Sequence, residues 1–395
     1  MKLCMNSNTE KIDEKQDGNL NMKKKAIILT YFLFFLVISS CNTSMQISIN
    51  EIPLHKNEQI VRISSLFTPY NHLQLKDCGA PSLVSDVDRV VFCGNKVYVF
   101  DDATDIIVCN DLTGRMLATT QKHKGHGKNE YVQLSDMAYD EETGYIYALC
   151  DTPSEIMVLD SLLKIIDVIP IKCQPTEMCV LNDCLILLCR DYSSGNFEVL
   201  SVSKKNIDNN PSVVLSSPMV NNRVMGMGRC LSVTNGECWV SLPFNRSIYR
   251  IDDSEIKEEY RIDFGDNWYK NKHSSKPLDF IEENIDRIWS ISNIQKCNEC
   301  LWFNTNSELL YCLDTNTKEC KSYDIIHDSI PFATQLIIPQ QGMKDKLSFH
   351  IMHGFIRSYL RKSEDHINLR NSQVYILAKE NEIERNALIM IWNMK

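Results

Sequence analysis

The sequence has few of the residues that mark disordered or fibrous proteins, since only 14 glycines and 12 prolines occur among its 395 residues. Chains that stay disordered or form collagen-like fibres contain a far larger share of these two residues. Hydrophobic residues make up 44% of the sequence, which is enough to fill the core of one large domain or two ordinary ones. The composition therefore predicts a globular protein.

Long runs of basic residues are also missing, and the formal net charge is −9. Proteins that bind the phosphate backbone of nucleic acids gather Lys and Arg on one surface. The lysine triplet Lys23–Lys25 instead precedes an apolar run near the N-terminus. We therefore expect no nucleic-acid partner.

The sequence lacks a G-x-S-x-G nucleophile motif, and its one C-x-x-C pair, Cys297 and Cys300, has no second pair to complete a tetrahedral zinc site. Because Asn298 suits a turn position, a β-turn between two strands is the alternative interpretation of the pair. Several other cysteines lie in apolar runs, where a thiol packs as a small hydrophobic group. We expect such core thiols at Cys109, Cys150, Cys179, Cys189, Cys238 and Cys312.

An apolar run near the N-terminus predicts export. Residues 22–41 read MKKKAIILTYFLFFLVISSC, with an apolar segment from Ala26 to Ile38 before Cys41. The segment is shorter than the roughly 20 residues that span a bilayer as a helix, but it suits a secretion signal. The ending VISSC resembles a bacterial lipobox, whose cysteine becomes the lipidated first residue of the mature protein. A plain signal peptide cut near Ser40, or a buried apolar helix, is the alternative.

These features predict the organisation of the chain. Because Met22 opens a complete signal by itself, residues 1–21 are expected to be an over-long gene start, followed by a lipoprotein signal peptide over residues 22–40. Residues 41–57 then form a tether, and residues 58–395 form the folded domain. No acidic run directly follows Cys41, and in related envelopes such a run tends to mark export to the outside. We therefore expect an anchor in the bacterial cell envelope that faces the periplasm.

Internal repeats organise the rest of the chain. VYVFDDATDIIVCNDLTGRML, from Val97, aligns without gaps with IYALCDTPSEIMVLDSLLKII, from Ile146. Further copies begin at Trp239 and Leu301, and another is expected around residues 197–202. Each unit combines short apolar strands with a turn led by an aspartate, namely Asp111, Asp160, Asp252 or Asp314.

The repeats predict an all-β fold. Short strands rich in Val, Ile and Tyr indicate antiparallel sheet, and a period of about 46 to 49 residues is the size of a four-stranded propeller blade. Five visible copies and the two chain ends predict a six-bladed β-propeller. We expect strands from both termini, Gln59–Phe67 and Ala387–Lys395, to complete the last blade, and residues 368–382 to form a short helix.

The order of these motifs carries a resemblance to a known family. An opening strand followed by SLF, then VYVFDD, a G-x-G-x-x-E-Y loop, IYALCD and a terminal NALIMIWNMK resemble the six-bladed β-propeller lipoproteins of diderm bacteria. That family is largely of unknown function and is related in fold to NHL-repeat proteins. The resemblance covers residues 58–395 and implies a fold and an envelope location, but no reaction.

The loop of this resemblance, KHKGHGKNEY at residues 122–131, is expected to connect two blades. In the family the loop usually reads G-x-G-P-G-E-Y, whereas this chain has Lys128-Asn129 in place of Pro-Gly. Glycines permit positive φ values or close packing, a glutamate can accept hydrogen bonds from loop amides, and a tyrosine can pack on the next blade. The residues expected in these structural roles are Gly125, Gly127, Glu130 and Tyr131.

Other roles of this loop remain open. Ligand contact without catalysis is one alternative, and a metal site formed by His123, His126 and Glu130 is another, although the flanking lysines repel a cation. A phosphate cradle is not expected, because the glycines neither follow a βαβ strand nor open a helix.

Polar residues recur near the starts of the expected inner strands, which surround the central channel of a propeller. The candidate ligand-binding residues at the mouth of this channel are Arg89, Asp136, Glu177, Arg229 and Arg287, with Asp88 and Asp286 beside two of the arginines. Charges of both signs can bind a zwitterion, a sugar or a peptide end. They can equally form salt bridges that hold blades together.

Two functions of different classes follow. The first is a non-catalytic binding propeller, without a cofactor, attached to the membrane by a lipid on Cys41 and holding a small-molecule, glycan or protein ligand. The second is a metal-dependent hydrolase or lactonase in which Asp136 and Glu177 help to hold Ca²⁺ or Zn²⁺ in the channel. The neighbouring arginines lower the affinity of the channel for a cation, which favours the first function.

We predict that replacing Cys41 with Ala blocks lipidation, because the lipid is attached through the thiol of that residue. The variant should remain unprocessed in the inner membrane or be released in soluble form, as measured by membrane fractionation and by the mass of the mature protein. A variant that matures and fractionates like the parent would contradict the lipobox interpretation.

Overall fold

The computed structural model describes residues 51–68, 71–76, 78–79, 84, 87–205, 211–220, 228–234, 236–252, 255–270, 277–307, 309–326, 341–343, 346–351, 353–363, 373–384 and 386–395. The chain divides into two compact units, Met1–Ile49 and Asn50–Lys395, and the described residues belong to the second. The expected gene start, signal peptide and lipidated Cys41 lie outside the described residues.

Four of the five sheets in the described residues contain four strands in antiparallel pairing. Three of these sheets are built from consecutive strands of the chain. The first contains β3 (Val87–Cys93), β4 (Lys96–Asp101), β5 (Ile106–Asp111) and β6 (Met116–Thr119). The second contains β7 (Gln133–Tyr139), β8 (Ile146–Thr152), β9 (Glu155–Leu159) and β10 (Ile165–Pro170). The third contains β11 (Pro175–Leu181), β12 (Cys184–Asp191), β13 (Asn196–Ser203) and β14 (Ser212–Pro218).

The largest sheet joins two further antiparallel arrays through one strand. The first array contains, in order, β15 (Leu231–Thr234), β16 (Glu237–Ser241), β17 (Ser247–Asp252) and β18 (Glu255–Asp263). The second contains β19 (Ile291–Cys297), β20 (Cys300–Thr305), β21 (Leu310–Asp314) and β22 (Glu319–Ile326). The strand β1 (Glu51–Arg62) runs parallel to both β18 and β22. It therefore covers the outer edge of each array, which would otherwise leave backbone groups unpaired.

The remaining four-stranded sheet combines segments from both ends of the domain. β2 (Asn71–Gln74) pairs with β25 (Leu388–Asn393), which continues through β24 (Lys346–Ile351) to β23 (Gln341–Met343). The expected closing segment Gln59–Phe67 does not take this place. Its residues 60–62 pair with β22, and only Phe67 forms a bridge to the C-terminal segment, at Met394.

The pairing of β2 with β25 has a physical reason that the composition of β2 does not suggest. β2 is short and mostly polar, but Leu73 is buried in a cluster with residues of β25 and of the β3–β6 sheet. The more apolar segment before β2 includes β1, which lies between the outer edges of the two arrays, and Ile52 of β1 is buried there. The folded domain therefore begins by Glu51, inside the segment expected to be a tether over residues 41–57.

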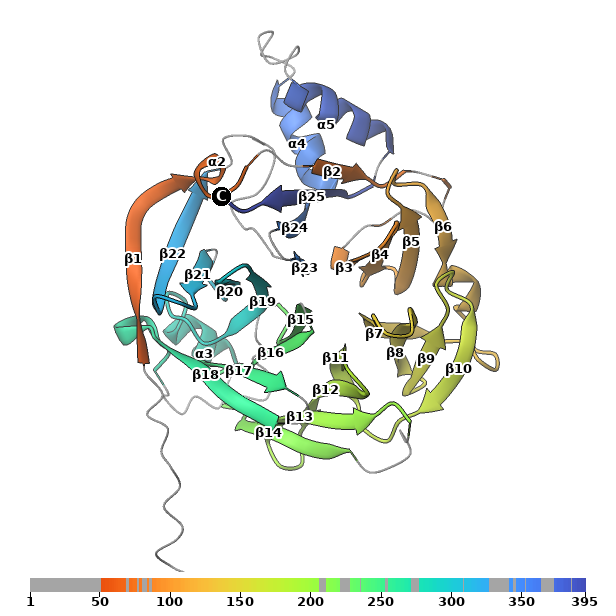
Figure 1. The fold of residues 1–395 in the computed structure, drawn as a ribbon, viewed down its shortest axis with the longest axis horizontal. Helices are drawn as coiled ribbons and strands as arrows, with labels where there is room; N and C mark the ends of the chain where they lie inside the picture. Colours follow the sequence, from red (N-terminus) through yellow and green to blue (C-terminus); the bar gives the residue numbers. More distant parts are fainter. Residues whose placement is uncertain are drawn as a thin grey trace, which may run out of the picture. The chain divides into compact units, whose positions relative to one another are not determined.

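One strand of each four-stranded sheet or array lies toward the centre in Figure 1, and these inner strands are β3, β7, β11, β15, β19 and β23. Second strands are apolar at almost every position because both faces of a sheet are covered by neighbours. In β4, Val97 and Val99 belong to the cluster shared with β25, while Tyr98 and Phe100 belong to the cluster shared with the β7–β10 sheet. Six such hydrophobic clusters fill the spaces between neighbouring sheets.

Helices are few and lie beside the sheets (Figure 1). The expected helix over residues 368–382 corresponds to α5 (Gln373–Glu384), whereas α4 (His353–Ser363) and α3 (Pro277–Glu283) were not expected from the sequence. The other helical turns are α2 (Ile63–Leu66), η2 (Thr120–His123) and η3 (Gly265–Asn267). No helix among the described residues has both the length and the apolar content needed to cross a bilayer.

The repeated aspartate turns have the geometry that the alignment predicts. The Asp111 carboxylate accepts hydrogen bonds from the backbone N–H groups of Thr113 (2.8 Å) and Arg115 (3.1 Å). Asp160 does the same with Leu162 (2.8 Å) and Lys164 (2.9 Å) in the next sheet. A short carboxylate side chain that binds the backbone two residues later fixes a tight turn between strands.

The C-x-x-C pair is a hairpin turn. Cys297 ends β19, Cys300 begins β20, and the two are paired across the ladder. Asn298 has a φ of 51°, a left-handed conformation that Asn tolerates well. The described cysteines are all free thiols, and nine of them, including Cys297 and the six expected core thiols, are buried.

The loop at residues 122–131 connects the first sheet to the second. The Tyr131 ring is buried in the cluster between the two sheets, and its hydroxyl bonds the Thr120 hydroxyl (2.8 Å) and the Asp105 carbonyl (2.9 Å). The Gly127 N–H donates to the Glu130 carboxylate over 2.6 Å. His123 reaches the carbonyl of Leu163, 3.0 Å away in the turn before β10, so this ring also bridges the two sheets.

The two glycines of the loop are required for space, not for a positive φ. Neither Gly125 nor Gly127 has a left-handed backbone, and the positive φ of 62° belongs to Asn129, where the family usually has glycine. A Cβ on Gly125 would lie 2.1 Å from a carboxylate oxygen of Glu130, and one on Gly127 would lie 2.9 Å from the same atom. Of the two roles expected for these glycines, close packing against Glu130 is therefore the one that the structure shows.

We predict that Gly125→Ala lowers the free energy of unfolding by about 1–3 kcal/mol, because the added Cβ displaces the Glu130 carboxylate from the Gly127 N–H. In a Glu130→Ala background the same change should cost much less, since the obstructing carboxylate is gone. Urea denaturation of the two single variants and the double variant measures this coupling.

Two histidine variants complete the experiment. His126→Ala, at an exposed position, should change the free energy of unfolding by no more than about 0.5 kcal/mol, and His123→Ala should cost about 1 kcal/mol through its lost hydrogen bond. A metal site that uses both histidines would instead make both variants clearly less stable and make thermal unfolding sensitive to EDTA.

Candidate functional site

A repeated irregularity in the first strands directs polar side chains toward the central axis. In β3, β7 and β11 the register with the second strand shifts by one residue just before Arg89, Asp136 and Glu177. Such a bulge leaves one extra residue unpaired and turns the neighbouring side chain. Three successive sheets therefore place a charged residue at an equivalent position.

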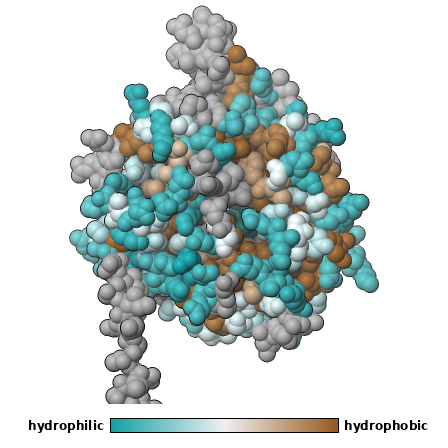
Figure 2. Space-filling model, in the orientation of Figure 1, coloured by the Kyte–Doolittle hydropathy of each residue, from teal (hydrophilic) through white to brown (hydrophobic). Residues whose placement is uncertain are grey.

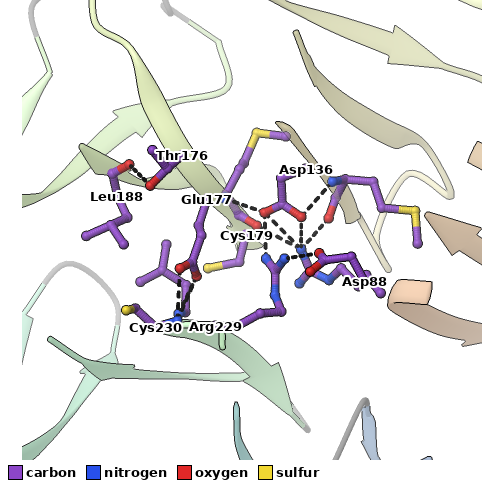
Figure 3. A network of polar contacts seen from close by, with 12 residues as sticks. Asp88, Asp136, Thr176, Glu177, Cys179, Leu188, Arg229 and Cys230 are labelled. Atoms are coloured by element: carbon purple, nitrogen blue, oxygen red, sulfur yellow. Dashed lines mark hydrogen bonds and ion pairs between the residues drawn. The ribbon is translucent and has the colours of Figure 1, made fainter. Parts of the chain in front are cut away.

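Asp136 lies at the centre of the resulting network (Figure 3). Its side chain is 0% exposed and forms ion pairs with Arg89 (3.2 Å) and Arg229 (2.6 Å). The carboxylate also accepts the backbone N–H groups of Met137 (2.7 Å) and Met178 (2.6 Å). A buried carboxylate with two cations and two amide donors is fully compensated.

The two arginines connect Asp136 to neighbouring sheets. Arg89 also donates to the carbonyl oxygens of Met137 and Met178, the second over 2.9 Å. Arg229, just before β15, forms a further ion pair with Asp88 over 3.0 Å. Four of the inward-facing sheet segments are thereby tied together through charge-assisted hydrogen bonds.

Glu177 is held by the chain that enters β15. Its carboxylate accepts the backbone N–H groups of Cys230 (2.8 Å) and Leu231 (2.9 Å), as Figure 3 shows. Burial raises the pKa of Glu177, while the charge of Arg229 and these amides oppose the increase. The carboxylate therefore anchors the backbone between the third sheet and the β15–β18 array.

Burial and charge act in opposite directions on the arginines. Burial would lower the pKa of Arg229, but the charges of Asp136, Asp88 and Glu177 outweigh it and raise the pKa. For Arg89, burial and the charge of Arg229 together lower the pKa, and Asp136 opposes them. Asp136 is thus the group that allows two guanidinium groups to lie close together.

Arg287, the fifth candidate from the sequence, lies elsewhere. It donates to the carbonyl oxygens of Asp266 and Trp268. The similarity of DRIWS (residues 286–290) to DRVVF (residues 88–92) suggested an inner strand at Arg287. In the structure β19 begins only at Ile291. The segment before it pairs instead with the connection after β18, through a bridge from Trp268 to Ile288.

Asn293 is the residue of β19 that contacts Arg229. It has a φ of 54° within a bulge of β19. Its side chain accepts the Arg229 N–H over 2.9 Å, and its own N–H donates to the Arg229 carbonyl over 2.8 Å. A Cβ on Gly228 would lie 2.5 Å from this side chain, so glycine is needed there. The sequence signal that could have identified this residue is an asparagine within the first strand of a repeat.

Two cavities lie at opposite ends of the inner strands, and Arg229 lines both. The larger, which we call the mouth cavity, has a volume of about 660 Å³. It is lined by the starts of inner strands and the ends of second strands: Asp88, Asp102, Gln133, Leu134, Ser135, Asp151, Gln174, Pro175, Thr176, Glu177, Arg190, Tyr192, Gly228 and Arg229. The smaller cavity, of about 310 Å³, is lined among others by Arg89, Tyr139, Glu141 and Gln295.

The mouth cavity is also lined by residues that were not predicted from their positions in the repeats. Arg190 and Tyr192 lie at and just after the end of β12, and the Tyr192 side chain is 64% exposed. An arginine at the end of an otherwise apolar strand was the signal in the sequence. Asp102 and Asp151, which the repeat alignment places on each other, both line this cavity.

No group of three or more His, Cys, Asp or Glu side chains in the described residues is arranged to hold a metal ion.

The thiol of Cys230, beside Glu177, has a pKa raised well above its usual value by burial and by the Glu177 carboxylate. A thiol that stays protonated is a weak nucleophile. Hydrophilic residues, with apolar ones between them, cover much of the face in Figure 2.

Comparisons with known proteins give a family and a fold. The profile of a family described as a domain of unknown function, DUF4934, matches residues 48–391. No curated protein matches the chain. A crystal structure of a Bacteroides fragilis protein described as exported is 16% identical, with a TM-score of 0.63, and the match covers 88% of this chain and 100% of that chain.

Two further structures are more distant. A DUF4221 family member from Bacteroides vulgatus is 12% identical, with a TM-score of 0.49 over 84% of this chain and 97% of that one. A catalytically inactive virginiamycin B lyase from Staphylococcus aureus, solved with quinupristin, is 11% identical, with a TM-score of 0.44 over 82% and 100% of the two chains.

We predict that Asp136→Asn lowers the free energy of unfolding by about 3–5 kcal/mol, because it leaves two buried guanidinium groups without their shared carboxylate. The matched control is Asp88→Asn, which removes the same charge from a side chain that is 38% exposed and should cost about 1 kcal/mol or less. Urea denaturation followed by circular dichroism compares the variants. Equal losses of stability would contradict a central role for Asp136.

Proposed function

The chain belongs to the DUF4934 family, a family of unknown function. For this member we propose the function of a non-catalytic binding protein of the bacterial cell envelope. Its ligand, a small molecule or the end of a glycan or protein, occupies the mouth cavity. The observation that carries this proposal is an open cavity of about 660 Å³ that is lined by Asp88, Glu177 and Arg229, three members of the charge network.

The cavity has the properties of a binding site that is formed before the ligand arrives. Its volume lies within the range of about 300–1,000 Å³ that is usual for small-molecule sites. Two of its lining residues are held in place, Arg229 by the ion pair with Asp136 and Glu177 by the backbone N–H of Cys230. A rigid lining lowers the entropy lost on binding, because fewer protein groups must be ordered.

The same contacts favour binding over catalysis. Asp136 and Glu177, the carboxylates that a metal-dependent hydrolase would use, are engaged by arginines and backbone amides. A general base must be free to accept a proton from a substrate. Releasing either carboxylate would break the contacts between sheets.

We further assign six blades closed in a ring. The nine-stranded sheet counts as two blades joined by β1, and β2 beside β25 completes the last blade. The support is the set of six hydrophobic clusters, one between each pair of neighbouring sheets. One of these clusters contains residues of β2, β3 and β25 together, so the last blade packs on the first.

The envelope location rests on the N-terminal sequence. Residues 22–40 have the composition of a lipoprotein signal, and Cys41 is the proposed site of lipidation. The folded domain begins about ten residues after Cys41. The similar Bacteroides fragilis structure, described as exported, agrees with this location.

The proposal is tested with the mature protein on arrays of immobilised glycans and peptides. The double variant Gln133→Trp with Gln174→Trp places two large side chains at exposed positions of the mouth cavity and should abolish binding to the array ligands. The matched control, Glu141→Trp, lies at the smaller cavity and should bind like the parent. Binding that survives in the double variant, or turnover of a bound ligand, would refute the proposal.

A further inference from the structure

We propose that the mouth cavity binds a zwitterionic ligand of short-peptide size, with its carboxylate on Arg190 and its ammonium group on the acidic side of the cavity. This inference rests on the proposed function, because it names the class of ligand for the same site.

Arg190 is the first observation. The Nε atom of its guanidinium group is buried and has no hydrogen-bond partner among the described residues. No described carboxylate lies within ion-pair distance of it, whereas the other arginines of the two cavities, Arg89 and Arg229, are paired with Asp136. A positive group thus lines the cavity without a compensating partner from the described part of the chain.

An unpaired guanidinium group in a partly buried position is costly. Burying a cation without a partner raises the free energy of the folded state, and proteins normally avoid it by pairing the charge. The planar fork of N–H groups on arginine matches the two oxygens of a carboxylate. A ligand carboxylate would therefore satisfy Arg190 more fully than water does.

The acidic side is the second observation, and it comes from different sheets. Asp102 follows β4, Asp151 lies near the end of β8, and Asp88 lies on the bulge of β3. All three line the mouth cavity, whereas Arg190 belongs to the third sheet. The cavity is also lined by Glu177, on the third sheet, and by Arg229, but Glu177 is held by backbone N–H groups and Arg229 is paired with Asp88 and Asp136. Arg190 is therefore the positive group of the cavity that no described carboxylate pairs.

This combination of charges selects the ligand. An anion bound at Arg190 would also meet the carboxylates of Asp102 and Asp151 across the cavity, and a cation bound at those carboxylates would meet Arg190. A molecule with an ammonium group at one end and a carboxylate at the other satisfies both sides. A cavity of about 660 Å³ has the volume for a peptide of a few residues, and the exposed Tyr192 ring beside Arg190 offers it an apolar surface.

Isothermal titration calorimetry with three probes tests the proposal. The probes are the tripeptide Ala-Ala-Ala, its C-terminal amide and its N-acetyl derivative. The free tripeptide should bind at least tenfold more tightly than either capped form, because each cap removes one of the two charges. Equal binding of the free peptide and either capped form, or no binding of the free peptide, would overturn the proposal.

Variants assign the carboxylate site to one residue. Arg190→Gln should weaken binding of the free tripeptide at least tenfold and leave the C-terminal amide unaffected. The matched control is Arg115→Gln, an exposed arginine that does not line the cavity, and it should bind like the parent. Loss of peptide binding in the control as well would overturn the role of Arg190.

The failure of this inference differs from the failure of the proposed function. If an array ligand binds and is lost in the Gln133→Trp/Gln174→Trp variant, but the tripeptide does not bind, the zwitterion is wrong and the binding site stands. If binding of every array ligand survives in that double variant, the proposed function itself fails.

Discussion

Burial of both faces of every sheet is the constraint on which the rest of this structure depends. A four-stranded sheet whose second strand reads VYVF or IYAL has no face that can meet water, so each sheet needs a neighbour on both sides. Alternate residues of one strand supply two different clusters, as Val99 and Phe100 do in β4. The arrangement of sheets around an axis, and the inward position of their first strands, follow from this requirement (Figure 1).

The same arrangement brings the starts of the first strands together at the axis, where charges must be compensated. Bulges in three strands turn Arg89, Asp136 and Glu177 inward, and Asp136 separates two guanidinium groups that would otherwise repel each other. The network therefore stabilises contacts between sheets and also contributes Glu177 and Arg229 to the lining of the mouth cavity. Arg190, which this network leaves out, is the group from which the proposed ligand chemistry derives.

Much of the candidate site could be predicted because charged residues at the starts of apolar strands are conspicuous. Arg89, Asp136, Glu177 and Arg229 were found in this way, and the structure brings them together. Arg287 lies elsewhere because its string DRIWS follows α3 and ends just before β19, so Arg287 belongs to a connection with one bridge and not to an inner strand. Arg190 was missed because it ends a second strand, and its unpaired state depends on which groups surround it in space.

The period of the repeats, the four-stranded sheets and the aspartate turns can be predicted from the sequence, because they depend on residues close together in the chain. Which distant segments pair becomes clear only in the folded domain. The sequence favoured Gln59–Phe67 as the partner of the C-terminal strand, yet the shorter and more polar β2 takes that place while β1 covers two outer edges. The physical reason is that strand pairing is selected by the edges and clusters left open by all other sheets, and these exist only once the chain has folded.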